Sequence, residues 1–215
     1  MRKWCSLLMV SLMAIVLVGC KSKEEKALET IKSELFKTLY DFDSYQPIET
    51  VVSEAKQTPL NDYECWSRAE ILSTAIHNVS GYLDLAKDAK ENKEYWSSNY
   101  YVSDFVKEYK EKYTKYAEKA NELVEICNSV AKEINDIMSN FNSSENIGWN
   151  VKHTFRCKTK GGISEIVHYR YVLSKDFKSV LLRENLESDD DKMTRNVIEN
   201  VLPDWEDFPQ IPVEL

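Results

Sequence analysis

One apolar stripe constrains the fold of this chain more than any other feature. It begins at Val102 and ends at Phe141, and the steps between its apolar residues mostly alternate between three and four. Its members are Phe105, Tyr109, Tyr113, Tyr116, Ala120, Leu123, Cys127, Val130, Ile134, Ile137 and Phe141. The stripe predicts one helix of about forty residues, which is roughly 60 Å long at 1.5 Å per residue. Its period, near 3.5 residues, predicts a left-handed coiled-coil seam against a partner helix.

The region before this stripe supplies the partner helix. Residues 60–91 carry an apolar stripe on one helical face, made of Trp66, Ala69, Leu72, Ile76, Val79, Leu83 and Ala86. The polar stretch Lys90–Lys93 predicts the turn, so the two helices form an antiparallel hairpin. Two shorter helices are predicted upstream, an N-terminal one over 24–42 and a second over 48–56, between two prolines.

The pattern changes to period two after the long helices. Apolar and polar residues alternate from Trp149 to Cys157, which predicts a strand with one buried face. Lys160–Gly162 predicts a hairpin turn, and Ile163–Leu173 and Val180–Leu182 continue as the second and third strands. The apolar face of such a small meander has to pack on the helices.

Together these patterns predict an α+β fold. A long antiparallel helical hairpin with an N-terminal helix is followed by a three-stranded antiparallel β-meander and a C-terminal helix. Ser188 is the expected N-cap of that last helix, which ends near Leu202, and the tail from Pro203 is expected to be extended. The helical region, 27–141, and the β region with its helix and tail, 147–215, are expected to pack as one domain.

The N-terminus carries an export signal. The basic pair Arg2-Lys3 precedes the apolar run Leu7–Val18, which is too short to span a membrane because a spanning helix needs roughly 20 apolar residues. The run ends in Leu17-Val18-Gly19-Cys20, which resembles the lipobox read by the lipoprotein signal peptidase. The resemblance implies a signal peptide over 1–19, a lipidated Cys20 with palmitate-type acyl chains and a charged tether over 20–26. An ordinary secretory signal with an incidental cysteine is the alternative.

Several mature segments resemble uncharacterised lipoproteins of Bacteroidetes. They are Thr38–Pro47, Gly148–His153, Phe155–Lys158 and Lys175–Lys178. The resemblance implies a cell-envelope location and transfers neither an activity nor a site residue. Lys21 is compatible with sorting to the outer membrane. The anchored protein would then face either the periplasm or the cell surface. Lys23-Glu24-Glu25 resembles a surface-export tag, and a solvated charged tether explains these three residues equally well.

The chain shows no catalytic, metal or cofactor motif, because it has no glycine-rich phosphate loop, CxxC pair, HExxH or GxSxG. His153 and His168 lie on adjacent predicted strands, but the expected register puts them on opposite faces. Cys157 has no recognisable oxyanion hole, and Asp189–Asp191 fits a helix N-terminus better than a calcium site. The net charge of −8 disfavours nucleic acid as a partner.

Cys65, Cys127 and Cys157 remain in the predicted mature chain beyond the lipidated cysteine. An odd number cannot all pair within one chain. The envelope is oxidising, so a disulfide between Cys65 and Cys127 is possible if the hairpin turns near residue 95. The alternative is that all three are buried thiols that behave as small hydrophobic residues.

The sharpest functional hypothesis concerns the turn of the hairpin, where Tyr95, Trp96, Tyr100 and Tyr101 cluster. Exposed aromatic residues bind sugars by stacking and partner proteins by burial. For the tyrosines further along the helix, a place in the core is the favoured interpretation. The leading function is therefore non-catalytic binding or scaffolding of a protein or glycan partner at the outer membrane. A surface receptor for glycan or nutrient is the first alternative, and an uncharacterised envelope enzyme is the second.

Overall fold

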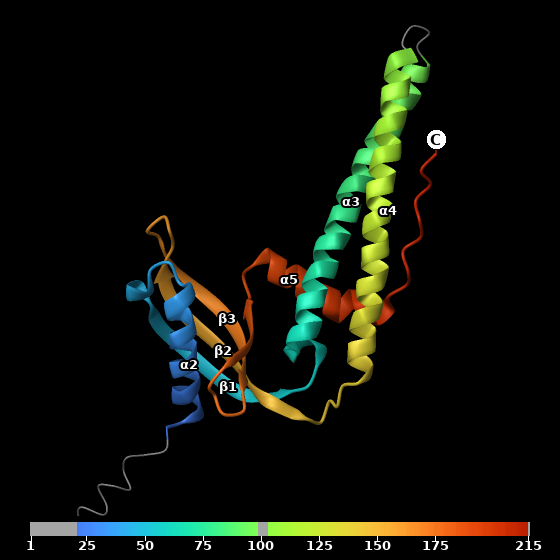
Figure 1. Cartoon of the computed structure of the whole chain (residues 1–215). Coiled ribbons are helices and arrows are strands. Elements are labelled where there is room, and N and C mark those ends of the chain that lie inside the picture. The colour runs from blue at the N-terminus through green and yellow to red at the C-terminus, as the bar shows by residue number, and fades with distance from the viewer. Residues whose placement is uncertain (1–20, 99–102, 215) are drawn as a thin grey trace, which may run out of the picture.

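The computed structural model describes residues 21–98 and 103–214 and has the predicted α+β class (Figure 1). The helices are α2 (Lys23–Thr38), α3 (Tyr63–Ser97), α4 (Ser103–Ser139) and α5 (Asp189–Asn196). The strands are β1 (Gln46–Lys56), β2 (Asn146–Lys158), β3 (Ser164–Ser174) and β4 (Val180–Asn185). Among the described residues, no helix combines the length and the apolar character needed to cross a membrane.

The long helical hairpin is confirmed, but its turn is displaced from the predicted position. Helices α3 and α4 contain 35 and 37 residues, so each is roughly 50–55 Å long. Asp62 is the N-cap of α3, and its side chain accepts a hydrogen bond from the Cys65 amide at 2.9 Å. Lys90–Lys93, the predicted turn, lies inside α3. The error has a simple cause, since Lys and Glu are good helix formers and this stretch contains neither Gly nor Pro.

The predicted short helix over 48–56 is wrong, because these residues form most of strand β1. The β-branched residues Ile48, Thr50, Val51 and Val52 favour extended backbone. Their apolar members also fit helical spacing, so the pattern alone misleads. A long-range partner decides between helix and strand, since β1 pairs antiparallel with β2 and places Val52 opposite Val151. The predicted three-stranded meander is present and becomes a four-stranded sheet in the order β1-β2-β3-β4.

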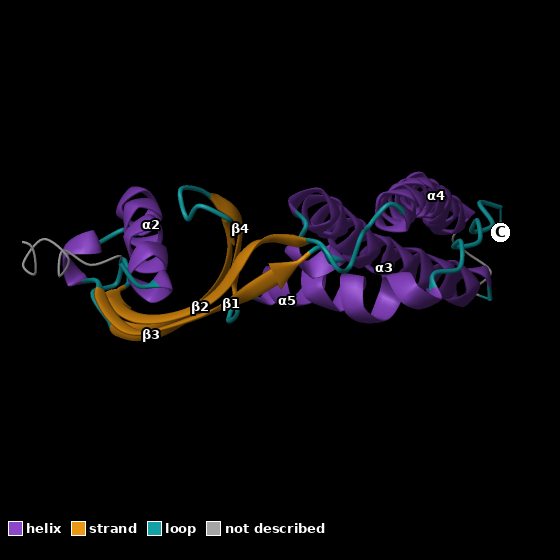
Figure 2. Cartoon of the chain, turned by 90° about the horizontal axis from the view of Figure 1, so that it is seen from below, coloured by secondary structure: helices purple, strands orange, loops and turns teal. Residues whose placement is uncertain are grey.

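Helix α2 covers one face of this sheet near its outer end (Figure 2). Ser22 and Glu25 form a capping box that fixes the start of the helix. Fully buried Ala27, Ile31 and Leu35 then pack against a sheet face made of Val151, Phe155, Tyr171 and Leu173. The helix ends at Thr38, four residues before the predicted end.

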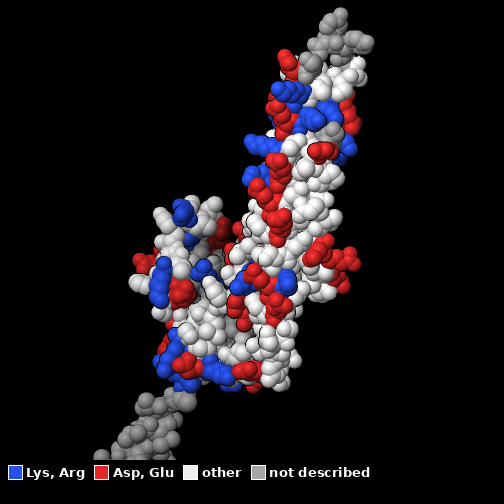
Figure 3. Space-filling model, turned by 45° about the vertical axis from the view of Figure 1, so that its right-hand side comes forward, with Lys and Arg blue, Asp and Glu red and all other residues white. Residues whose placement is uncertain are grey.

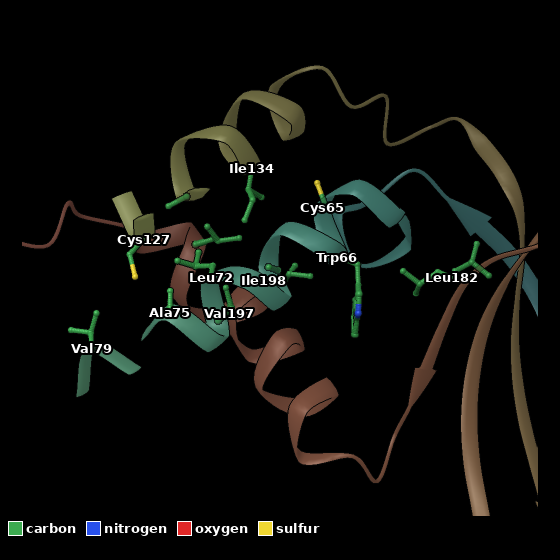
Figure 4. Packing of buried hydrophobic residues seen from close by; sticks show 14 of the residues in the cluster. Cys65, Trp66, Leu72, Ala75, Val79, Cys127, Ile134, Leu182, Val197 and Ile198 are labelled. Atoms are coloured by element: carbon green, nitrogen blue, oxygen red, sulfur yellow. The ribbon is translucent and has the colours of Figure 1, made fainter. Parts of the chain in front are cut away.

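The base of the hairpin, helix α5 and the inner end of the sheet share a second core (Figure 4). Leu72 of α3, Ile134 of α4 and Ile198 after α5 meet there, and Trp66 and Leu182 extend the cluster to the sheet. The last helix is confirmed at its Ser188 cap. Beyond Asn196 it continues as a π-helical turn, Val197–Val201, and a 3₁₀ turn, Leu202–Asp204. The following tail is extended and lies along the hairpin (Figure 1).

Candidate functional site

The end of the hairpin carries an aromatic cluster in which Tyr95 and Phe105 are exposed and Trp96 is half-buried. Trp96 of α3 stacks on Phe105 of α4, with ring centroids 5.0 Å apart and an interplanar angle of 23°. Tyr95 meets the Trp96 ring edge-on at 5.2 Å. Tyr95 is 63% exposed and Phe105 is 44% exposed. We call Tyr95, Trp96 and Phe105 the tip cluster. Tyr100 and Tyr101, the other two predicted site residues, lie outside the described residues.

Phe105 is the member of the tip cluster that sequence reasoning assigned to the helix seam instead. It lies on the predicted apolar stripe of α4, so its spacing indicated a core position. The fully buried seam starts two steps later on the stripe, at Tyr113. Tyr109 and Tyr116 are half-buried against the same small cluster, made of Ala86, Ala89, Tyr113 and Ala117. The core interpretation of these helix tyrosines is therefore confirmed most clearly for Tyr113.

The C-terminal tail docks on α4 through paired amide hydrogen bonds. Asn128 donates from Nδ2 to the Phe208 carbonyl (3.1 Å) and accepts at Oδ1 from the Phe208 amide (2.9 Å). Asn121 makes the same pair with Ile211, at 2.9 Å and 2.7 Å. The Tyr113 hydroxyl donates to the Pro212 carbonyl at 2.8 Å. We call this face of α4, with Tyr113, Ala117, Asn121 and Asn128, the tail groove.

Charged side chains of both signs are interspersed along the outside of the hairpin (Figure 3). Many form pairs one helical turn apart, such as Lys112 with Glu108 at 2.6 Å and Lys119 with Glu122 at 2.6 Å. These exposed pairs support the long helices only weakly, because solvent screens them. Within the described part of the hairpin, the tip cluster and the tail groove differ in chemistry from these charged faces.

A buried ionic cluster joins the sheet to the hairpin base. Glu184 of β4 is 2% exposed, accepts from the Arg170 Nε and forms a two-pronged pair with Arg195 at 2.7 Å from both Nε and Nη2. Arg170 also donates to the Leu60 carbonyl (2.6 Å) and to the Asn61 side chain (2.8 Å), just before α3. Burial opposes ionisation of Glu184, but hydrogen bonds from the two arginines outweigh it and lower the pKa of its carboxyl.

The two sheet histidines lie on opposite faces of the sheet, which confirms the predicted register. His153 is opposite Tyr169, and His168 is opposite Thr154, so their side chains point to opposite faces. His153 is buried and His168 is exposed. The Glu49 carbonyl, 3.1 Å from Nδ1, requires a proton on that nitrogen, so Nε2 accepts from the Tyr45 hydroxyl at 2.9 Å. Burial lowers the pKa of His153 to about 4.

No disulfide joins Cys65 and Cys127, and both are buried free thiols. They lie toward different ends of the core cluster, Cys65 near Trp66 and Cys127 near Val79 (Figure 4). The disulfide required a turn near residue 95, but α3 continues to Ser97. A turn about four residues later shifts the register of the two helices by about eight residues, which is roughly 12 Å. Burial raises the pKa of Cys65 to about 12 and that of Cys127 to about 11. Across residues 21–98 and 103–214, no three His, Cys, Asp or Glu residues are grouped to hold a metal ion.

A pocket of about 350 Å³ lies where α3, the β3–β4 edge and α5 meet. Three aromatic residues line it, namely Tyr63, Trp66 and Tyr169, together with charged Glu70, Arg183 and Asp191. Tyr63 is 67% exposed, so its ring is open to solvent. Aromatic faces beside polar groups are the surroundings that sugars use.

No protein-family model, no curated protein and no solved structure matches this chain. The function therefore has to be inferred from the chain's own residues.

Proposed function

We propose that this chain is a membrane-anchored lipoprotein that works as a non-catalytic binding or scaffolding module at the outer membrane. In this proposal Cys20 carries the lipid, and Lys21 onward forms the tether. The lipobox-like Leu17–Cys20 and the basic and apolar segments before it support the anchor. Two or three acyl chains hold a protein stably, since each buried CH₂ contributes about 0.8 kcal/mol.

The observation that carries the binding role is the position of the tip cluster relative to the start of the described chain. Helix α2 lies at the end of the molecule opposite the last turn of α3 and the first turn of α4 (Figure 1). The hairpin separates the tip from the sheet by roughly 50 Å. A partner that contacts Trp96 and Phe105 would therefore be met well away from the tether. Clustered aromatic residues at a surface are typical centres of protein contacts.

Fatty-acid labelling tests the anchor. Cells that express the wild-type chain should incorporate an alkyne-labelled palmitate into it, and Cys20→Ala should abolish the label. Cys5→Ala is the matched control, because Cys5 lies in the predicted signal. Full labelling of the Cys20→Ala variant would contradict the proposal. Density fractionation and protease shaving of intact cells then distinguish the outer from the inner membrane and the surface from the periplasm.

Photo-crosslinking from the tip tests the binding role. A photoreactive phenylalanine at Tyr95 should capture a discrete partner, and Trp96→Ala with Phe105→Ala should weaken capture by about tenfold. The same probe at Phe36, which is 70% exposed on α2, is the control. Equal capture from both positions, or capture that survives the double substitution in a folded chain, would rule out the tip as the contact.

A glycan receptor is the second candidate, and the pocket beside Tyr63 is what favours it. Tyr63→Ala should abolish binding to any oligosaccharide that the wild-type chain retains on a glycan array. Phe36→Ala should leave that binding unchanged. Glycan binding that does not depend on Tyr63 would reject this pocket as the receptor site.

A further inference from the structure

The tail groove matches an extended backbone in its spacing. Asn121 and Asn128 are seven residues apart on α4, which is about 10.5 Å along the helix axis. Their partners, Phe208 and Ile211, are three residues apart in an extended tail, which is about 9–10 Å. The two lengths agree, so both amide side chains pair with the tail at the same time.

Asn121 and Asn128 make their hydrogen bonds to peptide groups of the tail and not to its side chains. Each asparagine satisfies the N–H and the C=O of a single residue, Phe208 or Ile211. Asparagine is a poor residue for a helix interior, so two of them on one face of α4 indicate a role beyond helix formation. An extended chain with N–H groups at these two places would meet the same donors and acceptors.

The tail sequence is suited to this geometry. Both paired residues are followed by proline, Pro209 and Pro212, and a residue before proline favours extended backbone. The prolines have no N–H, and the paired amides belong to the residues before them. Trp205, Phe208 and Ile211 are half-buried and three residues apart, as on one side of a polyproline helix with three residues per turn, and Val213 follows two residues later.

The apolar side chains of the tail meet a shallow surface. Ile211 and Val213 pack on the cluster of Ala86, Ala89, Tyr113 and Ala117, and both remain half-buried. The small alanines leave room along the helices, and the Tyr113 hydroxyl holds the Pro212 carbonyl. The groove thus selects for apolar residues at the first, fourth and sixth positions of an extended segment.

We propose that the tail groove is a binding site for extended peptide segments of other proteins, and that the chain's own tail occupies it as an internal competitor. The ligand class is an extended peptide with the tail's pattern, in which apolar residues stand at positions one, four and six and proline follows the first two of them. This site is distinct from the tip cluster and does not depend on the function proposed for it.

Exchange is feasible because residues 205–214 form neither helix nor strand, so their release breaks no backbone pairing within a regular element. The release of this tail leaves the segment after α5 in place, since Val197, Ile198 and Leu202 are buried in the core at the hairpin base. A tethered tail acts at an effective concentration on the order of millimolar. The groove therefore opens only to a ligand that binds more strongly or is locally abundant, so the tail sets a threshold for binding.

A peptide-binding assay on the full-length chain tests the proposal. The probe is a fluorescent peptide with the sequence of residues 205–215, and anisotropy reports its binding. Ile211→Asp in the chain removes an apolar anchor of the tail and leaves the groove intact. This release variant should bind the probe about tenfold more tightly than the wild-type chain does. Adding Asn121→Ala and Asn128→Ala to the release variant should remove that gain.

Modified probes separate backbone recognition from simple hydrophobic attachment. A probe N-methylated at the residues matching Phe208 and Ile211 loses both paired N–H groups and should bind about tenfold more weakly. A probe N-methylated at the residue matching Gln210 is the control and should bind as the parent does. Equal binding of all three probes, or no binding to the folded release variant, would overturn the proposal. A wild-type chain that forms dimers dissociated by Ile211→Asp would also overturn it, because the groove would then hold the tail of a second copy.

Discussion

Replacing Glu184 by glutamine removes one negative charge from the ionic cluster between the sheet and the hairpin base. The side chain keeps its size, so the change acts through charge and hydrogen bonding. In the wild-type chain Glu184 accepts hydrogen bonds from Arg170 and Arg195, and only 2% of it is exposed. Glutamine accepts at one oxygen only, and its NH₂ group would face a guanidinium group.

The expected loss of stability depends on which arginine loses its charged partner and stays buried. Arg195 is 28% exposed at its side chain and keeps Glu199 at 2.9 Å, so solvent and a second carboxylate remain available to it. Arg170 is only 10% exposed at its side chain and would keep just neutral partners, the Leu60 carbonyl and the amides of Asn61 and Asn150. Breaking a buried pair costs about 3–5 kcal/mol. Because Arg170 retains good neutral acceptors, we expect about 3 kcal/mol.

Urea unfolding followed by circular dichroism measures this loss, and Glu199→Gln is the matched control. This control makes the same chemical change at a carboxylate that also pairs with Arg195. The Glu199 side chain is 43% exposed, so its loss should cost about 0.5 kcal/mol. The pKa of Glu184 is lowered in the folded chain, so its ionised form adds stability above its ordinary pKa of 4.5. That contribution is lost as the pH falls through the lower folded pKa. A loss equal to that of Glu199→Gln at pH 7 would refute the reasoning.

Three further predictions follow from individual residues. Gly148→Ala should destabilise the chain severely in thermal unfolding, because an added Cβ would lie 1.9 Å from the Leu173 carbonyl oxygen, whereas Gly81→Ala, with open space around it on α3, should stabilise by up to about 1 kcal/mol. The pKa of His153 is lowered from 6.5 to about 4, so the unfolded chain binds the extra proton between these values; stability should rise with pH across that window, and the rise should be smaller in a folded His153→Gln variant. Alkylation under non-reducing, denaturing conditions should label Cys65, Cys127 and Cys157 in the unlipidated chain, and mass spectrometry that finds a mass two units low with two labels missing would show a disulfide instead.

The α4 seam shows both the strength and the limit of periodicity. The predicted stripe and the buried seam share Tyr113, Ala120, Cys127 and Ile134. Between these positions the structure buries the smaller neighbours, Ala117, Val124 and Ala131, instead of the larger Tyr116, Leu123 and Val130. Counting large apolar residues finds the period, but close helix approach favours small side chains. The rotation of the helix about its axis depends on the partner, which the pattern of one helix does not contain.

Strand β1 and the tail groove were missed for a related reason. The pairing of β1 with β2 joins segments about a hundred residues apart, and long-range pairing leaves little local signal in the sequence. Asn121 and Asn128 are polar and fall outside the apolar stripe, so hydrophobic periodicity gives no indication of their role. Their spacing of two helical turns, together with two prolines in the tail, is the signal that could have indicated the groove.

The tail and the tip cluster are connected through the outer half of the hairpin. The hairpin base buries large side chains such as Leu72 and Ile134, whereas the outer cluster buries Ala86, Ala89 and Ala117 around one tyrosine. Less buried apolar area gives lower local stability, so the outer half should open more readily. Ile211 and Val213 of the tail add apolar cover there.

Release of the tail should therefore loosen the segment that presents Trp96 and Phe105. Any ligand that refills the tail groove restores this cover, so occupancy of the groove and contact at the tip are linked, and each must strengthen the other by the same factor. The Ile211→Asp variant should then crosslink to a tip partner more weakly than the wild-type chain, and the extended peptide should restore the crosslink. Tip contacts that do not respond to release of the tail would show that the two surfaces act independently.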